Sequence, residues 1–388
     1  MKIVLNAVSA KMGGAVSYLT NLLRNLPPRQ SEYQFVAYLS SETARRLTDL
    51  PANIKLCCVP DKYIAGWRRV WWEQITLRRL LRTEKGDLLF STANFAMFRC
   101  PVKQILLVRN ALYFSQIYKQ TFLRRHSAKM RIAFRLRRWM ICRSVKSADL
   151  VMTPTQTMLD ELRQYVELPD SKAFVNPYGT EPPDSEGSKP ATQASGDTSV
   201  AQRAIRLLFV SLYSEHKNLA TLLKAMLLLN KDGGDKFFLR TTADPAWEAA
   251  AWTVTHEDDL ALSWHPDVAP WVEFLGPLGN EKVQQLYREG DLFVFPSLCE
   301  SFGHPLVEAM AHGLPVVASD LPVNREICGD AAVYFSPLCS EDLAHQLTRV
   351  VVNNDLRRRL ATFGRQRAAT RFRWSEHVIT FLKYCESS

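Results

Sequence analysis

The sequence predicts an α/β protein built from two doubly wound, Rossmann-like domains. Short apolar runs alternate with helical patterns, which is the order expected of parallel sheets flanked by helices. The chain has 388 residues, 47% of them hydrophobic, which is enough for two such domains with substantial cores. The stretch 181–204 is rich in Pro, Ser, Gly and charge and poor in large apolar residues, so it predicts a linker between the domains.

The strands of the first domain are expected where apolar runs are bounded by polar or glycine-containing segments. These runs are Ile3–Ala7, Tyr33–Leu39, Ile54–Val59, Asp87–Ser91, Gln104–Arg109 and Asp149–Thr153. Gly13 and Gly14 lie between the first strand and the following helix. Such a turn allows backbone amides to face a bound anion, although a tight turn without a ligand is the alternative.

The second domain repeats the same alternation. Its expected strands are Leu207–Ser211, Phe237–Thr242, Val272–Gly276, Asp291–Phe295, Leu314–Ser319 and Ala331–Phe335, and its last helices are Glu341–Val352, Leu356–Arg367 and Trp374–Cys385. Lys217 stands just before a helix in this domain. A cation there adds to the partial positive charge of the helix N-terminus, which suits a phosphate group.

The stretch 295–320 combines a strand end, a polar loop, a helix and a further strand. Glu300 lies in the loop, and Glu308 is expected in the first turn of a helix that begins at Pro305, a residue favoured at that position. Glu308 is suited to accept hydrogen bonds from a vicinal diol such as a ribose, and Glu300 to contact a bound sugar. Gly303 allows the backbone to approach the ligand closely. Solvated surface carboxylates are the alternative interpretation of the two glutamates.

The full string of this stretch, E-S-F-G-x-P-x-x-E-A-M-A-x-G-x-P-V-V-A-S, resembles the donor-sugar signature of the retaining glycosyltransferases of family 4. That family has the GT-B fold, in which two Rossmann-like doubly wound domains face a central cleft. The resemblance implies an acceptor-side domain over 1–180 and a nucleotide-sugar-binding domain over 205–372. It also implies that residues 373–388 form a helix crossing back to the first domain.

The resemblance also implies roles for particular residues. Glu300 and Lys217 would be catalytic, with Glu300 at the donor sugar and Lys217 at the leaving diphosphate. The donor-binding residues would be Gly276, Leu278, Ser301, Phe302, Gly303, His304, Pro305, Leu306 and Glu308, and the phosphate and acceptor loop would contain Gly13, Gly14 and Asn110. The chain departs from the family in two places. Arg109-Asn110 stands where many members have a histidine, and Ser211-Leu212 replaces a Gly-Arg pair that binds phosphate.

The implied reaction moves a hexose-type sugar from a nucleotide diphosphate sugar to an acceptor hydroxyl, with retained anomeric configuration, in polysaccharide or lipid-linked glycan assembly. No DxD motif is present, so we expect neither a metal nor a cofactor besides the nucleotide sugar substrate. Two alternatives are a sugar-nucleotide epimerase of the same fold and a basic nucleic-acid-binding protein. The chain contains no nucleic-acid-binding motif, which disfavours the second.

The net charge of +10 is concentrated in residues 119–146, which contain ten Lys or Arg and no Asp or Glu. A helix here would carry an apolar stripe of Met130, Phe134, Ile141 and Val145 and a basic stripe of Arg131, Arg135 and Arg138. Such a helix suits an anionic membrane or a lipid-linked acceptor, and a solvated face over a core stripe is the alternative. The segment 67–82 mixes tryptophans with five arginines, and the same two interpretations apply to it.

The remaining composition predicts a cytoplasmic location, on the inner face of the membrane if the basic helix binds there. The sequence contains no run of eighteen apolar residues, so we expect no membrane-spanning helix. The apolar run at the N-terminus is too short for a signal peptide and predicts a strand. The eight cysteines show no CxxC spacing, so we expect buried free thiols in a reducing compartment.

Overall fold

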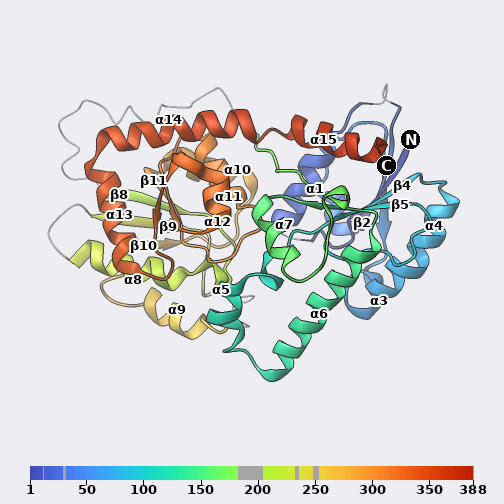
Figure 1. Ribbon diagram of the computed structural model, residues 1–388. Coiled ribbons are helices and arrows are strands. Elements are labelled where there is room, and N and C mark those ends of the chain that lie inside the picture. Colours follow the sequence, from blue (N-terminus) through green and yellow to red (C-terminus); the bar gives the residue numbers. More distant parts are fainter. Residues whose placement is uncertain (12, 29–31, 182–203, 232–235, 248–252, 388) are drawn as a thin grey trace. The chain divides into compact units, whose positions relative to one another are not determined.

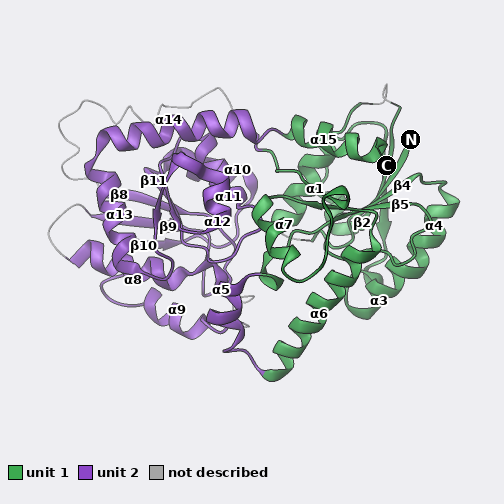
Figure 2. Ribbon diagram, in the orientation of Figure 1, with its two compact units in different colours: residues 1–114, 128–179, 374–388 green, residues 115–127, 180–373 purple. Residues whose placement is uncertain are grey.

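The computed structural model describes the chain except for residues 12, 29–31, 182–203, 232–235, 248–252 and 388 (Figure 1). The chain divides into two compact units (Figure 2). Unit 1 contains residues 1–114, 128–179 and 374–388, and unit 2 contains residues 115–127 and 180–373. All but the two ends of the predicted linker, 181–204, lies outside the described residues.

Unit 1 contains a seven-stranded parallel sheet in the order β3-β2-β1-β4-β5-β6-β7. The strands are β1 (Lys2–Asn6), β2 (Gln34–Ser40), β3 (Ile54–Val59), β4 (Leu88–Ser91), β5 (Lys103–Leu107), β6 (Leu150–Thr153) and β7 (Ala173–Val175). The helices are α1 (Gly14–Arg24), α2 (Ser41–Arg45), α3 (Gly66–Trp71), α4 (Leu77–Thr83), α6 (Ala128–Ser147), α7 (Gln156–Arg163) and α15 (Trp374–Glu386). Shorter helical turns are η1 (Asp61–Tyr63), η2 (Trp72–Thr76), η3 (Ala111–Tyr113) and η5 (Asp170–Lys172).

Unit 2 contains a six-stranded parallel sheet in the order β10-β9-β8-β11-β12-β13. The strands are β8 (Ile205–Phe209), β9 (Phe237–Thr241), β10 (Val272–Phe274), β11 (Leu292–Phe295), β12 (Val316–Ser319) and β13 (Ala332–Phe335). The helices are α5 (Gln116–Tyr118), α8 (Leu219–Lys231), α9 (His256–Ser263), α10 (Asn280–Glu289), α11 (His304–Ala311), α12 (Pro322–Cys328), α13 (Ser340–Val352) and α14 (Asn354–Arg371). Shorter turns are η4 (Lys119–Leu123), η7 (Glu215–Lys217), η9 (Ala269–Trp271) and η10 (Gly329–Ala331).

The predicted α/β class and both series of strands are confirmed, with strand ends that differ by at most two residues from the expected ones. Strands such as β4 and β11 are buried along their whole length, because parallel strands covered on both faces are continuously apolar. Strand β7 was not predicted, because it has only three residues and no long apolar run.

The C-terminal helix α15 packs against α1 within unit 1. Its His377 is fully buried among Tyr18, Tyr178 and Trp374. His377 Nδ1 lies 2.9 Å from the carbonyl oxygen of Pro177, so this nitrogen carries the hydrogen. Nε2 then accepts from the Tyr18 hydroxyl at 3.2 Å. Both ring nitrogens are satisfied only in the neutral imidazole, and burial lowers the pKa of His377 to about 4.

Helix α6 agrees only in part with the two predicted stripes. Phe134, Ile141 and Val145 are buried, which fits the alternative of a core stripe, whereas Met130 is 40% exposed. In the basic stripe, Arg131 and Arg135 are exposed, but Arg138 is partly buried. Its guanidinium lies 4.6 Å from the centre of the Tyr165 ring. The exposed face also carries an apolar row of Ile132, Leu136 and Trp139, which are 64%, 55% and 62% exposed.

The cysteines are free, as predicted, but most are not fully buried. Only Cys299, Cys328 and Cys385 are buried, and Cys58 is exposed. None of the helices in the described part of the chain is long and apolar enough to cross a membrane.

The buried imidazole of His377 should make the stability of the protein depend on pH. The pKa is about 4 when folded and near 6.5 when unfolded, so the unfolded chain binds the extra proton as the pH falls below about 6.5. We expect the free energy of unfolding to drop by about 2 kcal/mol from this residue between pH 7 and pH 5. Urea unfolding of the wild type and of His377→Gln at both pH values measures it. An equal loss in both proteins would contradict the assignment.

Candidate functional site

The sheet of unit 2 changes winding direction between β8 and β11. The chain leaves β8 towards β9 on one side and leaves β11 towards β12 on the other, while β8 and β11 are direct neighbours. In open α/β sheets, ligands bind at the carboxyl ends of the strands beside such a switch point. The loops that follow these two strands therefore define the candidate site.

Lys217 and Glu300, the two residues predicted to be catalytic, are in direct contact at this place. Lys217 Nζ donates to Glu300 Oε1 at 2.6 Å, although the two residues are 83 positions apart. Their side chains are only 17% and 12% exposed. Partial burial strengthens the attraction between the two charges relative to a pair in open water. The pair thus presents one cation and one anion at the edge of the sheet.

The loop after β11 leads into α11 through Gly303. This residue has φ 84° and ψ 58°, a left-handed conformation that side-chain-bearing residues rarely adopt, and it caps α11. A Cβ added here would lie 3.0 Å from Leu306 Cδ1. The helix begins at His304, one residue earlier than predicted, with Pro305 in its first turn. Its N-terminal end carries partial positive charge near the loop that contains Glu300.

Glu308 lies in the second turn of α11, whereas the sequence predicts it in the first turn. Its Oε2 accepts a hydrogen bond of 2.8 Å from the hydroxyl of Tyr287 on α10. Burial raises the pKa of Glu308, and the Tyr287 hydrogen bond partly offsets that rise. The carboxylate is therefore already oriented by one donor. Its predicted role at a ribose stays a prediction.

The other predicted donor-binding residues differ in how they are exposed. Phe302 and Leu306 are buried, and their predicted contacts with a donor stay a prediction. The His304 ring lies edge-on to Phe302, with ring centres 5.2 Å apart, and both Ser301 and His304 are partly buried. Gly276 adopts φ 63° and lies beside the Asp244 carboxylate, and Leu278 is partly buried.

In unit 1, the predicted loop residues lie after β1 and β5. Gly13, with φ 56° and ψ −145°, caps α1, which starts at Gly14. Asn110 accepts from the Leu112 amide at 3.2 Å. The amides of Arg109 and Asn110 both donate to Asn94 Oδ1, at 2.9 and 3.2 Å. Asn94 thus fixes the loop after β5, and the sequence analysis missed it.

Arg109 is the first residue of the pair Arg109-Asn110, which stands where many family members have a histidine. Its guanidinium lies 5.5 Å from the centre of the Tyr18 ring. Its positive charge also lowers the pKa of the Tyr178 hydroxyl, although burial outweighs this effect and leaves the pKa raised to about 12. The cation is therefore part of the aromatic cluster that holds α15.

Within the described ranges, no three His, Cys, Asp or Glu side chains are grouped in a way that would hold a metal ion. The expectation of a reaction without a metal stays a prediction.

Two family models match the chain. The model described as "Glycosyltransferase Family 4" matches residues 12–182, and the model described as "Glycosyl transferases group 1" matches residues 204–353. The second match includes Lys217, Glu300 and Glu308. The chain belongs to glycosyltransferase family 4.

The chain spans less than half of the length of the curated relatives described here. The O-antigen chain mannosyltransferase B of Escherichia coli is 28% identical over 169 residues, which cover 43% of this chain and 42% of the relative. The D-inositol 3-phosphate glycosyltransferase of Corynebacterium diphtheriae is 32% identical over 183 residues, which cover 45% and 41%.

Solved structures match along the full chain. Anabaena Alr3699/HepE in complex with UDP-glucose has a TM-score of 0.73 at 16% identity, with both chains covered completely. Sucrose-phosphate synthase from Thermosynechococcus elongatus also has a TM-score of 0.73, at 15% identity, covering 100% of this chain and 98% of the other. At these identities the likeness shows the fold, which is GT-B with its two Rossmann-like domains.

Replacing Gly303 should disturb the start of α11. We expect Gly303→Ala to lower the free energy of unfolding by at least about 1–2 kcal/mol, because a left-handed backbone and a close Leu306 contact both oppose the added methyl group. Gly279→Ala is the matched control. Gly279 also caps a helix, but it has φ −69° and no atom within 4 Å of an added Cβ. Thermal unfolding compares the two variants, and equal stability would contradict the strained role of Gly303.

Proposed function

We propose that this protein transfers a hexose-type sugar from a nucleotide diphosphate sugar to a hydroxyl group of an acceptor, with retention of the anomeric configuration. The observation that carries this proposal is the contact between Lys217 and Glu300 at the switch point of the unit 2 sheet. A cation there matches a diphosphate, and an adjacent carboxylate matches sugar hydroxyls.

The chemistry requires stabilisation of a leaving diphosphate. The bond between the anomeric carbon and the phosphate oxygen breaks, and a new bond forms to the acceptor oxygen on the same face. The acceptor proton passes to the departing phosphate. Lys217 and the N-terminal end of α11 supply positive charge where negative charge develops, which is often the largest catalytic contribution of a site. Glu300 holds the donor sugar, and no carboxylate nucleophile is required.

The relatives support the class of donor and product. A structural relative with the same fold was solved in complex with UDP-glucose. Several sequence relatives are named mannosyltransferases, among them one of the O-antigen chain. We therefore infer a hexosyl donor and a role in polysaccharide or lipid-linked glycan assembly for this chain.

We also propose that the protein contacts an anionic membrane through α6, where a lipid-linked acceptor would lie. The exposed apolar row of Ile132, Leu136 and Trp139 follows the helical spacing of one face. Exposed basic residues flank this row: Lys129, Arg131, Arg135, Arg143 and Lys146. Apolar side chains bordered by cations match the interface of an anionic bilayer, where each cation contributes about 1 kcal/mol.

Transfer from a panel of nucleotide diphosphate sugars, detected as released nucleoside diphosphate with and without added glycan acceptors, tests the proposed activity. Lys217→Ala should lower kcat by about 100- to 1,000-fold and change KM less, because the leaving diphosphate gains its charge in the transition state. Lys224→Ala, at an exposed lysine on α8, is the control and should keep the wild-type rate. A rise in KM alone would show that Lys217 only binds the donor in the ground state, and would contradict its catalytic role.

Because the pKa of Glu308 is raised, the strength of its predicted hydrogen bonds to a ribose should depend on pH. A carboxylate accepts diol hydrogen bonds well, and its protonation weakens them. Because the pKa is raised, affinity for a nucleoside diphosphate should begin to fall at a higher pH than for an ordinary glutamate. Glu308→Gln should bind about 10- to 100-fold more weakly at pH 8, since hydrogen bonds to charged groups contribute about 1.5–3 kcal/mol.

Calorimetric titrations from pH 8 to pH 5 check this pH dependence. The ratio of the two dissociation constants cancels titration of the ligand itself and should shrink as the pH falls. A ratio near one at every pH would remove Glu308 from the site, and a larger ratio that stays constant would contradict the predicted pH dependence.

The membrane contact predicts loss of binding when the exposed row is made polar. Replacing Ile132, Leu136 and Trp139 by serine should abolish sedimentation with anionic vesicles. Replacing Arg131, Arg135 and Arg143 by glutamine should weaken it most at low salt, where electrostatic attraction is least screened. Trp264→Ser, at a tryptophan of unit 2 that is 69% exposed, is the control for loss of an exposed aromatic residue. Equal sedimentation of all variants would leave α6 as a solvated face.

A further inference from the structure

Residues 115–127 belong to unit 2, although the chain on both sides of them belongs to unit 1 (Figure 2). This segment, which we call the crossover segment, contains α5, the π-helical turn η4 and His126. Nothing in the sequence pattern indicated that a piece of the first half of the chain packs with the second. Two polar contacts of this segment with the rest of unit 2 converge on one side chain.

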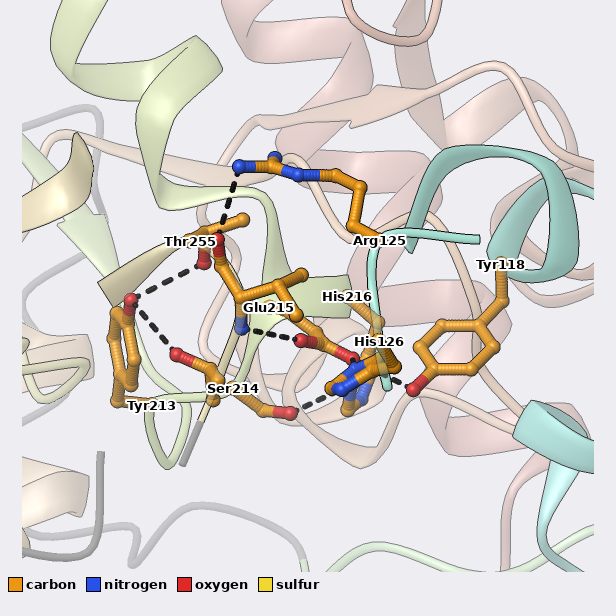
Figure 3. A network of polar contacts seen from close by, with 10 residues as sticks. Tyr118, Arg125, His126, Tyr213, Ser214, Glu215, His216 and Thr255 are labelled. Atoms are coloured by element: carbon orange, nitrogen blue, oxygen red, sulfur yellow. Dashed lines mark hydrogen bonds and ion pairs between the residues drawn. The ribbon is translucent and has the colours of Figure 1, made fainter. Parts of the chain in front are cut away.

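That side chain is Glu215, whose carboxylate is only 1% exposed. Tyr118 donates its hydroxyl to Glu215 Oε1 at 2.6 Å, and His126 Nε2 lies 2.8 Å from the same oxygen (Figure 3). The main-chain amide of Val254 donates to Oε2 at 3.0 Å. A buried carboxylate is tolerated only when donors surround it, and two of these three donors come from the crossover segment.

A second set of contacts between the crossover segment and the rest of unit 2 is weaker. Arg125 donates to the carbonyl oxygen of Val254 at 3.0 Å and pairs with Asp258 at 3.1 Å. Both side chains of the ion pair are about half exposed or more, so solvent screens their attraction. The buried carboxylate of Glu215, rather than this surface pair, therefore fixes the crossover segment.

Glu215 is the first residue of the turn η7, and Lys217 is the last. On its other side, the same turn is attached to the loop after β11. The carbonyl oxygen of His216 accepts from the Leu298 amide at 2.8 Å, and Asn218 Nδ2 donates to the Pro296 carbonyl oxygen at 3.1 Å. The backbone that carries Lys217 is thus held between the loop that leads to Glu300 and the crossover segment.

We propose that Tyr118 and His126 are positioning residues for the donor site. Through Glu215 they fix the turn η7, so that the ammonium group of Lys217 stays beside Glu300, where a diphosphate would bind. Neither residue touches the substrate. The assignment rests on the proposed function for its ligand, but the placement of Lys217 is testable without one.

The first experiment measures the position of Lys217 directly. Limited acetylation with acetic anhydride, followed by mass spectrometry, gives the relative reactivity of Lys217 in the full-length protein. In Tyr118→Phe, which removes one hydroxyl and keeps the ring, we expect the Lys217 acetylation rate to rise at least threefold while that of Lys224 stays constant. Tyr334→Phe is the control, because it removes a hydroxyl bound to the Gly329 carbonyl oxygen elsewhere in unit 2. An unchanged Lys217 rate in Tyr118→Phe would overturn the proposal.

The second experiment is a double-mutant cycle on turnover. Tyr118→Phe should lower kcat/KM about tenfold, the effect of one hydrogen bond to a charged group. In the Lys217→Ala background the same change should have almost no effect, since residues that act through one another are not additive. His126→Leu should behave like Tyr118→Phe, and His126→Gln, whose amide still donates, should recover most of the activity.

The two experiments separate the possible failures. An equal loss from Tyr118→Phe with and without Lys217 would overturn the positioning role even if the protein is active. Absence of transfer from every donor, together with the expected acetylation change, would refute the proposed function and leave Tyr118 and His126 as the groups that place Lys217.

Discussion

The parallel pairing of β8 with β11 is the contact on which the candidate site depends. Leu292 pairs with Leu207 and Phe293 with Leu208, so the carboxyl ends of two strands far apart in the sequence lie side by side. Because the chain turns away in opposite directions after these strands, their loops are free to converge on a ligand rather than on a neighbouring strand. The contact between Lys217 and Glu300 is a direct consequence of this register.

Three carboxylates of unit 2 are bound by a tyrosine hydroxyl. Tyr118 donates to Glu215, Tyr287 to Glu308 and Tyr213 to Asp259. A tyrosine supplies a hydrogen-bond donor from an otherwise apolar ring, so it orients a carboxylate without bringing a second charge into the interior. Burial still raises the pKa of Glu308 and of Asp259. The carboxylates are therefore held in fixed orientations at an energetic cost that the surrounding apolar core offsets.

In unit 1, the guanidinium of Arg109 packs against tyrosine rings. Arg109 lies over Tyr18 and beside Tyr178, in the cluster that also contains His377. Arg109, one of the two residues at the place of the family's histidine, thus belongs to the aromatic cluster that includes the C-terminal helix. Asn110, whose backbone is fixed by Asn94, remains the residue of this loop that is predicted to meet a substrate.

The fold class, nearly every strand and the family could be predicted from the sequence, because these depend on local apolar runs and on a contiguous signature between Glu300 and Ser319. The sequence also predicted that Lys217 and Glu300 share a site, through the resemblance. It could not predict the partners of the buried carboxylates, since Tyr287 and Tyr118 reach Glu308 and Glu215 only through packing of distant segments. Periodicity likewise indicated that α6 is amphipathic but not which of its apolar rows faces the core. That Phe134 packs inward while Trp139 faces outward, and that residues 115–127 pack with unit 2, emerges only in the folded molecule. Both outcomes depend on which surfaces of other elements are available to cover these segments.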